Sequence, residues 1–232
     1  MKTHIIYMSG SDFSVKMKDQ ATESLDALNI EYELFDGVLG RKGIDILNDH
    51  GVSPSSYVES MDWTDGTIGC LASHYLLWHK CAQGDEPFMI LEQDAIVLRN
   101  PEEILGDIDS VCHLDAYLPF ENIKTGFDHS EVYDKQVQLY ASGVKRYPKN
   151  RFYKNNSVTG SVFRGAYGYI MTPKGARRVL DFISKRGAFP ADRCLCEAAA
   201  PIQRSNCTYA RLNPFFKSLD IQRKYSSRDY LV

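Results

Sequence analysis

Short apolar runs and amphipathic segments alternate along the first part of the chain. Residues 3–8 form an apolar run that predicts a buried strand, and the polar turn 9–12 follows it. Apolar residues at helical spacing predict a helix over 13–28, and an alternating pattern predicts a strand over 30–35. A strand, a helix and a strand in this order form a βαβ unit, whose two strands pair in parallel.

The same alternation continues through the rest of the chain. Residues 41–60 are expected to form short helices and loops, and the irregular segment 120–165 is expected to be a long functional loop. Further helices are predicted over 64–83, 173–186 and 190 to about 200. Further strands are predicted over 88–91, 110–116, 166–171 and 208–212. This order predicts an α/β fold with a mixed, mainly parallel central sheet.

Length and composition are those of one globular domain. With 232 residues, 44% of them hydrophobic, the chain can bury a core, and we expect a single domain over 1–232. No apolar stretch reaches the ~18 residues of a membrane helix, and the apolar start is too short for a signal peptide. We therefore expect no transmembrane anchor and a cytoplasmic location, in a bacterium or a phage-infected host. The six cysteines show no metal-ligand spacing and are expected to be reduced thiols.

The net charge of −3 hides a strong asymmetry between the two halves. Residues 1–130 hold 8 Lys and Arg against 23 Asp and Glu, whereas residues 131–232 hold 19 against 7. A half this basic suggests a polyanionic partner, such as a diphosphate, a nucleic acid or an anionic membrane surface. Solvated helix faces account for part of this charge without any partner.

Candidate chemistry follows the predicted strand 88–91, which ends directly before Glu92, Gln93 and Asp94. Ligands of open α/β sheets bind at the carboxyl ends of the strands. Two carboxylates two positions apart can reach one hard cation, so Glu92 and Asp94 predict a Mn²⁺ or Mg²⁺ site that bridges a diphosphate. A solvated turn is the alternative interpretation.

Polar residues also follow the first two predicted strands. Ser9 and Gly10 come after the first, and Asp36 ends the second. Parallel strands end at one edge of a sheet, so these residues are candidates for binding a nucleoside there. Plain turn chemistry explains the same residues equally well.

Four segments carry recognisable motifs. Residues 66–78 match G-x-x-G-C-x-x-S-H-x-x-x-W, and residues 90–95 are similar to an L-E-D-D-x run in which Gln93 replaces the middle acidic residue. Residues 165–176 are similar to G-x-x-G-Y-x-x-x-x-x-G-A, and residues 190–192 to P-x-D. Together they resemble glycosyltransferase family 25, which includes lipooligosaccharide and collagen galactosyltransferases, over most of the chain.

The resemblance implies a nucleotide-diphospho-sugar transferase fold of the GT-A type. It implies an inverting transfer, in one displacement, from a nucleotide-diphospho-sugar donor such as a UDP-sugar to an acceptor hydroxyl. On this basis, residues 1–116 are expected to form the donor-binding half and residues 117–232 the basic acceptor-binding half.

The resemblance also suggests roles for single residues. Asp94 is the first candidate metal ligand, with Glu92 beside it or against the ribose, and Gln93 is a candidate substrate contact. His74 is a candidate donor-site residue, although a helical histidine is more often a buried core residue. An inverting transfer needs a general base, for which Asp192 is the candidate. A charge that stabilises a helix start is the alternative for Asp192.

The acceptor is open at this point. Arg151, Lys154 and Arg164 lie in the irregular segment and could hold donor phosphates or an anionic acceptor, with solvated surface as the alternative. The family favours a saccharide, such as lipopolysaccharide or lipooligosaccharide. The basic half, interleaved with aromatic residues, slightly favours hydroxymethylated cytosine in phage DNA. A catalytically inactive module that binds nucleotide sugars or polyanions is the third hypothesis, because Gln93 weakens the acidic run.

Overall fold

The computed structural model describes residues 1–53, 55, 63–97, 99–115, 144–146, 161, 163 and 165–210. Eight strands of this part form one sheet in the order β2-β1-β3-β7-β5-β8-β4, and β6 pairs with β8. The strands are β1 (Lys2–Tyr7), β2 (Glu33–Asp36), β3 (Phe88–Glu92), β4 (Ala95–Val97), β5 (Val111–Asp115), β6 (Lys145–Arg146), β7 (Gly168–Met171) and β8 (Ile202–Ala210). Strands β1, β2, β3, β5 and β8 run in one direction, whereas β4, β6 and β7 run in the other. The predicted α/β class with a mixed, mainly parallel sheet is confirmed.

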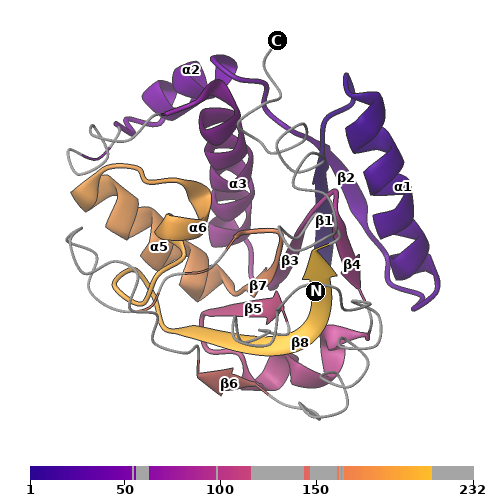
Figure 1. Ribbon diagram of the computed structural model, residues 1–232. Helices are drawn as coiled ribbons and strands as arrows, with labels where there is room; N and C mark the ends of the chain where they lie inside the picture. The colour runs from indigo at the N-terminus through magenta and orange to yellow at the C-terminus, as the bar shows by residue number, and fades with distance from the viewer. Residues whose placement is uncertain are drawn as a thin grey trace, which may run out of the picture.

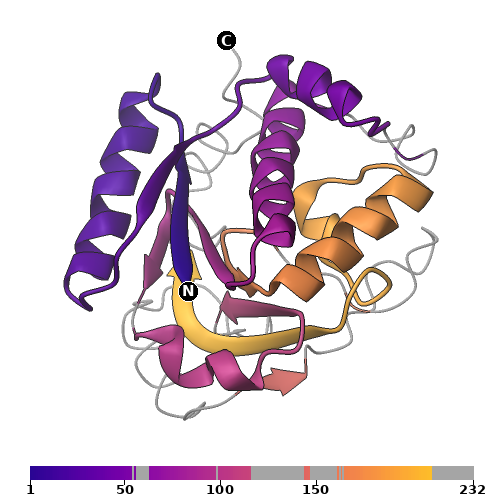
Figure 2. The same cartoon turned by 180° about the vertical axis from the view of Figure 1, so that it is seen from behind.

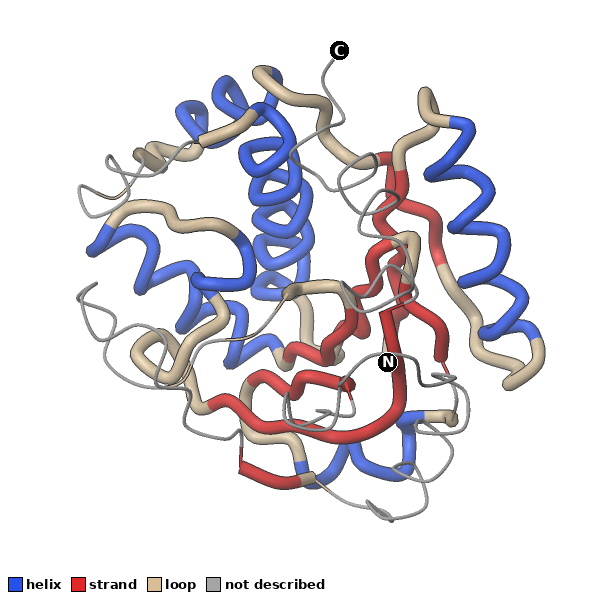
Figure 3. The backbone as a smooth tube through the Cα atoms, viewed as in Figure 1, coloured by secondary structure: helices blue, strands red, loops and turns tan. Residues whose placement is uncertain are grey.

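Helices cover both faces of this sheet (Figures 1 and 2). The helices are α1 (Asp12–Asp26), α2 (Lys42–Asp49), α3 (Asp65–Gln83), α5 (Pro173–Arg186), α6 (Ala191–Cys194) and the 3₁₀ helix η1 (Pro101–Asp107). Figure 3 shows the strands between α1 on one side and α3 with α5 on the other. None of the helices in the described ranges combines the length and apolarity needed to cross a bilayer.

The strands separate two hydrophobic clusters, because successive side chains of a strand point to opposite faces. Ile90 and Tyr169 face one cluster, which holds the buried side chains of α3, α5 and α6. Their neighbours Met89 and Ile170 face the other cluster, which includes Leu25 of α1. All four of these strand side chains are fully buried, so the central strands lie inside the protein.

Side-chain caps fix where the main helices begin. The hydroxyl oxygens of Ser11, Thr64 and Thr172 accept hydrogen bonds from backbone N–H groups three residues later. Each cap satisfies one of the N–H groups that lack a partner within the helix. The predicted helices 13–28, 64–83 and 173–186 are therefore confirmed to within two residues at each end.

Two elements differ in extent from their predictions. Helix α6 ends at Cys194, well before residue 200, because the next turn bonds to another segment. The Phe163 N–H donates to the Leu195 carbonyl at 3.0 Å, and the Glu197 N–H donates to the Ser161 carbonyl at 2.8 Å. Strand β8 begins six residues earlier than predicted, because its first residues pair in parallel with β5.

Other differences concern short elements. Strand β4 was not predicted; it has three residues and is held by antiparallel pairing with β8. Strand β2 starts three residues later than the predicted strand over 30–35. Most of the predicted loop 120–165 lies outside the described residues.

The parallel arrangement of β1, β2 and β3 brings their carboxyl ends to one edge. Tyr7 pairs with Asp36, and Ile6 pairs with Glu92. Strand β7 is antiparallel to β3, so its start lies at the same edge, where the Glu92 N–H donates to the Tyr167 carbonyl at 2.8 Å. We refer to this edge as the carboxyl edge.

Candidate functional site

Helix α3 carries two functional faces, each built from residues four positions apart. On the first face, a Cβ added to Gly69 would lie 2.3 Å from the Val38 carbonyl oxygen, so the loop after β2 packs directly on the helix backbone. The Val38 N–H donates to the Ser73 hydroxyl at 2.8 Å, and that hydroxyl donates to the Gly69 carbonyl at 2.8 Å. Gly69 and Ser73 therefore fix the loop that leaves Asp36 at the carboxyl edge.

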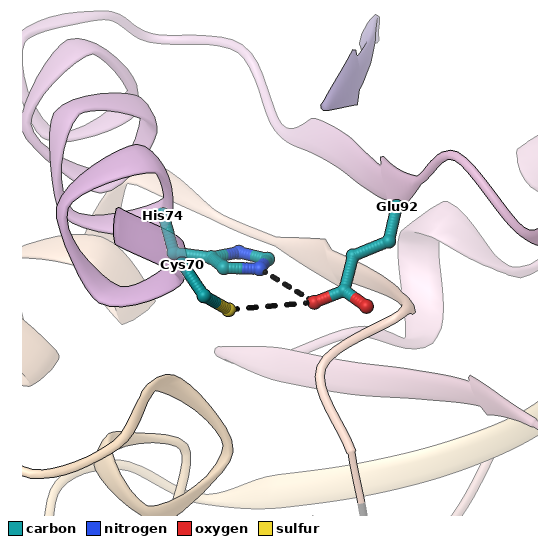
Figure 4. Close-up of side chains that lie close together, drawn as sticks. All are labelled: Cys70, His74 and Glu92. Carbon is teal, nitrogen blue, oxygen red and sulfur yellow. Dashed lines mark hydrogen bonds and ion pairs between the residues drawn. The ribbon is translucent and has the colours of Figure 1, made fainter. Parts of the chain in front are cut away.

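The second face of α3 points Cys70 and His74 toward Glu92 at the end of β3 (Figure 4). His74 Nε2 lies 3.1 Å from Glu92 Oε1, and the Cys70 thiol donates to the same oxygen at 3.7 Å. The ligand-type atoms of these three residues all lie within 4.8 Å of one another. One carboxylate oxygen thus takes both contacts from the helix.

Tyr169 and Trp78 lie behind His74 and complete a hydrogen-bonded row. The Trp78 indole N–H donates to the Tyr169 hydroxyl at 2.7 Å, and His74 Nδ1 lies 2.8 Å from that hydroxyl. Burial raises the pKa of Tyr169 well above its usual value, so the hydroxyl keeps its proton. Because an indole only donates, that proton is available to His74 Nδ1.

Asp192 shares the electrostatic environment of Glu92 and Cys70. Burial raises the pKa of Asp192, and the charge of Glu92 acts in the same direction, whereas the Arg193 charge and backbone hydrogen bonds with Gly165 and Arg193 lower it. Burial also raises the pKa of the Cys70 thiol, and the charges of Glu92 and Asp192 add to this shift. The predicted base and the predicted metal carboxylate therefore lie within electrostatic reach of each other.

Gly165 links Asp192 to a second buried histidine. The backbone of Gly165 adopts φ +85°, which favours glycine. Its carbonyl lies 3.2 Å from His113 Nε2 on β5, and its backbone also hydrogen-bonds with Asp192. Burial lowers the pKa of His113 to about 4, so this histidine is neutral near pH 7 and donates from Nε2.

The Ser9 and Asp36 side chains meet at the carboxyl edge, as predicted from the ends of β1 and β2. The Ser9 N–H donates to Asp36 Oδ1 at 2.9 Å, and the Ser9 hydroxyl donates to Oδ2 at 2.6 Å. Both residues are exposed, as is Gly10, where an added Cβ would meet no atom within 4 Å. This arrangement presents a fixed carboxylate next to the open end of β1.

Glu92 and Asp94 differ in exposure. Asp94 is 8% exposed, too little for the solvated turn considered as an alternative, and Gln93 beside it is half-buried. The side chain of Glu92 is 26% exposed, and Oε2 has no hydrogen bond to any described residue. Oxygen donors of this kind suit Mg²⁺ or Mn²⁺. Cys70 suits such an ion poorly, because its thiol is soft and stays protonated.

Several residues of the candidate site were not assigned from the sequence. Cys70, Trp78 and Tyr169 lie within the recognisable motifs, but no role at the site was predicted for them. The buried indole was a signal, because a buried Trp N–H needs an acceptor. Arg151, Lys154 and Arg164 lie outside the described residues. Free thiols, as predicted, are found at Cys70, Cys81, Cys112, Cys194 and Cys196.

Comparisons with known proteins agree with the motifs. Residues 4–195 match the model of glycosyltransferase family 25 (LPS biosynthesis protein). The chain is 28% identical over 130 residues to the lipooligosaccharide biosynthesis protein lex-1 of Haemophilus influenzae, covering 54% of this chain and 39% of that protein. It is 26% identical over 144 residues to lic2B of Haemophilus influenzae, also a lipooligosaccharide biosynthesis protein, covering 60% of this chain and 52% of that one. The chain thus spans about half or less of the length of these relatives.

Among solved structures, the galactosyltransferase LgtC in complex with donor and acceptor sugar analogues is similar with a TM-score of 0.42 and 10% identity. That similarity covers 87% of this chain and 73% of LgtC. The family model spans most of the chain and includes all four motif segments. The chain belongs to glycosyltransferase family 25.

Proposed function

We propose that this protein is an inverting glycosyltransferase that moves a sugar from a nucleotide-diphospho-sugar to a hydroxyl of a lipooligosaccharide or lipopolysaccharide acceptor. The observation that carries this proposal is the electrostatic interaction between Asp192 and Glu92, two carboxylates that lie within the range matched by the family model. The names of the two Haemophilus relatives support the saccharide class of acceptor.

The proposed reaction is a single displacement. The acceptor oxygen attacks the anomeric carbon of the donor sugar, the bond from that carbon to the diphosphate oxygen breaks, and the nucleoside diphosphate leaves. Asp192 takes the proton of the attacking hydroxyl. Its raised pKa makes the carboxylate more basic than an exposed aspartate and so favours this role.

The donor is proposed to lie along the carboxyl edge. Ser9, Gly10 and Asp36 are proposed to contact the nucleoside, because a fixed carboxylate can accept hydrogen bonds from ribose hydroxyls. Gln93 is proposed to contact the sugar, and the basic residues Arg151, Lys154 and Arg164 are proposed to contact phosphates.

Glu92 and Asp94 are the residues that would hold a divalent cation. A bound Mn²⁺ or Mg²⁺ supplies positive charge that stabilises the departing diphosphate. The chain's own part is to present carboxylate oxygens at the end of β3, of which Glu92 Oε2 has no partner among the described residues.

The test is a transfer assay with purified protein, a panel of nucleotide sugars including UDP-galactose, and two acceptors. We expect transfer to lipooligosaccharide fragments and none to hydroxymethylcytosine DNA. Transfer to the DNA alone would restore the acceptor that the charge distribution slightly favoured. Donor binding without transfer to either acceptor would support the inactive binding module.

Asp94→Ala is expected to abolish metal-dependent hydrolysis of the donor while the fold remains intact, measured by nucleotide release with and without Mn²⁺. Asp85→Ala is the matched control, because Asp85 is exposed in the turn before β3, at the opposite edge. Near-normal hydrolysis by Asp94→Ala would remove the metal role of this residue.

A further inference from the structure

The two oxygens of the Glu92 carboxylate have different surroundings. Oε1 takes the contacts of both His74 and Cys70. Oε2 has no hydrogen bond within the described part of the chain, and the side chain keeps 26% of its surface exposed. The carboxylate is therefore held through Oε1, whereas Oε2 is available to a ligand.

A buried row of hydrogen-bonded side chains leads to Glu92 Oε1. Trp78, Tyr169 and His74 are each completely buried, and they come from two elements, α3 and β7. The distances along the row are 2.7 Å from Trp78 to Tyr169, 2.8 Å from Tyr169 to His74 and 3.1 Å from His74 to Glu92. The row thus connects the hydrophobic core to the carboxyl edge.

Donors and acceptors in this row fit together in one arrangement. The indole of Trp78 only donates, and an ionised carboxylate only accepts. The Tyr169 hydroxyl accepts from Trp78 and donates to His74 Nδ1, which leaves the imidazole proton on Nε2 to donate to Glu92. In this arrangement each group of the row has a partner, so the tautomer and the orientation of the imidazole are both fixed.

We propose that Trp78, Tyr169 and His74 are positioning residues that hold Glu92 by Oε1 and so direct Oε2 toward the bound donor. His74 then acts through Glu92 without touching the sugar nucleotide. The identity of the ligand at Oε2 rests on the proposed function. The hydrogen bonds within the row can be tested without measuring sugar transfer. The opposing explanation is a core network that contributes to stability alone.

The first test is the tautomer of His74, measured by nitrogen-15 NMR of the whole chain with the signal assigned by its loss in His74→Asn. We expect a proton on Nε2 and an unprotonated Nδ1 shifted by the hydrogen bond from Tyr169. In Tyr169→Phe, that shift is expected to disappear. A proton on Nδ1 in the wild-type protein would overturn the proposed row, whether or not the protein transfers sugar.

The second test is kinetic. Tyr169→Phe keeps the buried ring and removes only the hydroxyl. Trp78→Phe removes the indole N–H that donates to Tyr169. The test needs only one of these two variants to fold. Loss of a group that orients a ligand-binding side chain typically costs about 10- to 100-fold in activity or metal affinity. We expect a decrease of this size in kcat, and in Mn²⁺ affinity measured by calorimetry with UDP, for Tyr169→Phe and a smaller one for Trp78→Phe.

Tyr75→Phe is the matched control, because Tyr75 is a buried tyrosine of the same helix α3 that lies outside the row. It is expected to leave kcat and Mn²⁺ affinity unchanged. Unchanged kcat and Mn²⁺ affinity in Tyr169→Phe, with lower thermal stability alone, would show that the network is only structural. A wild-type protein that shows the Nε2 tautomer but transfers no sugar would contradict the proposed function and leave the row intact.

Discussion

At the scale of single residues, the two carboxylates of the candidate site have different surroundings. Glu92 is partly exposed, and its Oε1 takes contacts from Cys70 and His74 of α3. Burial raises the pKa of Asp192, and the nearby charge of Glu92 adds to this shift. Two carboxyl groups of the same chemical kind can take different roles, as ligand and as base, when their environments differ in this way.

Asp192→Asn is expected to lower the transfer rate by about 100-fold or more, because proton transfer by a positioned base contributes about that much. Donor affinity should stay unchanged, since the amide is of the same size and is not proposed to contact the nucleotide. Steady-state kinetics and calorimetric donor binding measure the two effects. Asp181→Asn on the exposed side of α5 is the control and should have no effect. Full activity of Asp192→Asn would assign the base to another residue.

His113 makes a prediction for stability against pH. Its pKa is about 4 in the folded protein because of burial, compared with 6.5 for the unfolded chain. The unfolded chain therefore binds more protons in this interval, and the contribution of His113 to stability is complete above pH 6.5 and is lost as the pH falls to about 4. This pKa shift corresponds to a contribution of roughly 3 kcal/mol at most to the free energy of unfolding.

Urea unfolding at a series of pH values from 7 to 4 measures this contribution. In His113→Gln, an amide that does not titrate can still donate to the Gly165 carbonyl, so the decrease in unfolding free energy with falling pH should be smaller than in the wild type. His79→Gln is the control, because His79 lies at an exposed contact with Gln83. Equal pH profiles for the wild type and His113→Gln would contradict the assignment.

At the scale of elements, α3 organises the carboxyl edge. Its repeat of four residues places Gly69 and Ser73 against the loop after β2, and Cys70 and His74 against Glu92. The spacing of the motif over 66–78 is therefore explained by contacts on two adjacent faces of one helix. A displacement of α3 would therefore disturb both the loop after β2 and the contacts of the Glu92 carboxylate.

Gly69→Ala is expected to lower the unfolding free energy by about 1–3 kcal/mol, because the new Cβ would meet the Val38 carbonyl at 2.3 Å and the backbone must move. Alanine is otherwise the better helix former, so intrinsic propensity predicts the opposite sign. Urea unfolding decides between these signs. Gly106→Ala is the control, since a Cβ there meets no atom within 4 Å.

Local signals in the sequence were sufficient for the long helices but not for the contacts between elements. Ser11, Thr64 and Thr172 are capping residues next to amphipathic segments, so the helix starts could be predicted. The three residues of β4 and the early start of β8 depend on pairing with distant strands, which periodicity does not report.

The same distinction holds for the candidate site. Glu92 was found because it ends a buried strand, whereas its contact with His74 joins α3 to β3 and has no local signal. Tyr169 follows Trp78 by 91 positions, so only the fold brings the hydroxyl and the indole together. Sequence patterns therefore located the carboxylates and His74, but not the contact between His74 and Glu92 or the hydroxyl of Tyr169 behind it.

At the scale of the whole molecule, the charge asymmetry predicts how the acceptor is bound. Residues 131–232 carry 19 Lys and Arg against 7 Asp and Glu. This excess attracts anionic groups, and salt weakens the attraction because the screening length falls from about 10 Å at 0.1 M to about 3 Å at 1 M. The phosphate groups of a lipooligosaccharide core fit this excess, and so do those of DNA.

We expect affinity for phosphorylated lipooligosaccharide fragments to fall as salt rises from 0.1 to 1 M (about 10 to 3 Å of screening length), whereas dephosphorylated fragments should bind more weakly and show little salt dependence. Calorimetric titrations of both fragments, with duplex DNA as a competitor, measure this.

If the acceptor is a saccharide, its hydroxyls and rings make contacts in addition to the attraction between charges. DNA should then displace phosphorylated fragments at low salt and lose this ability at high salt. Equal affinity for both fragments at every salt concentration would show that the basic half does not bind the acceptor. Displacement by DNA that persists at high salt would instead mean contacts with DNA beyond its charge, and would favour the nucleic-acid acceptor over the saccharide.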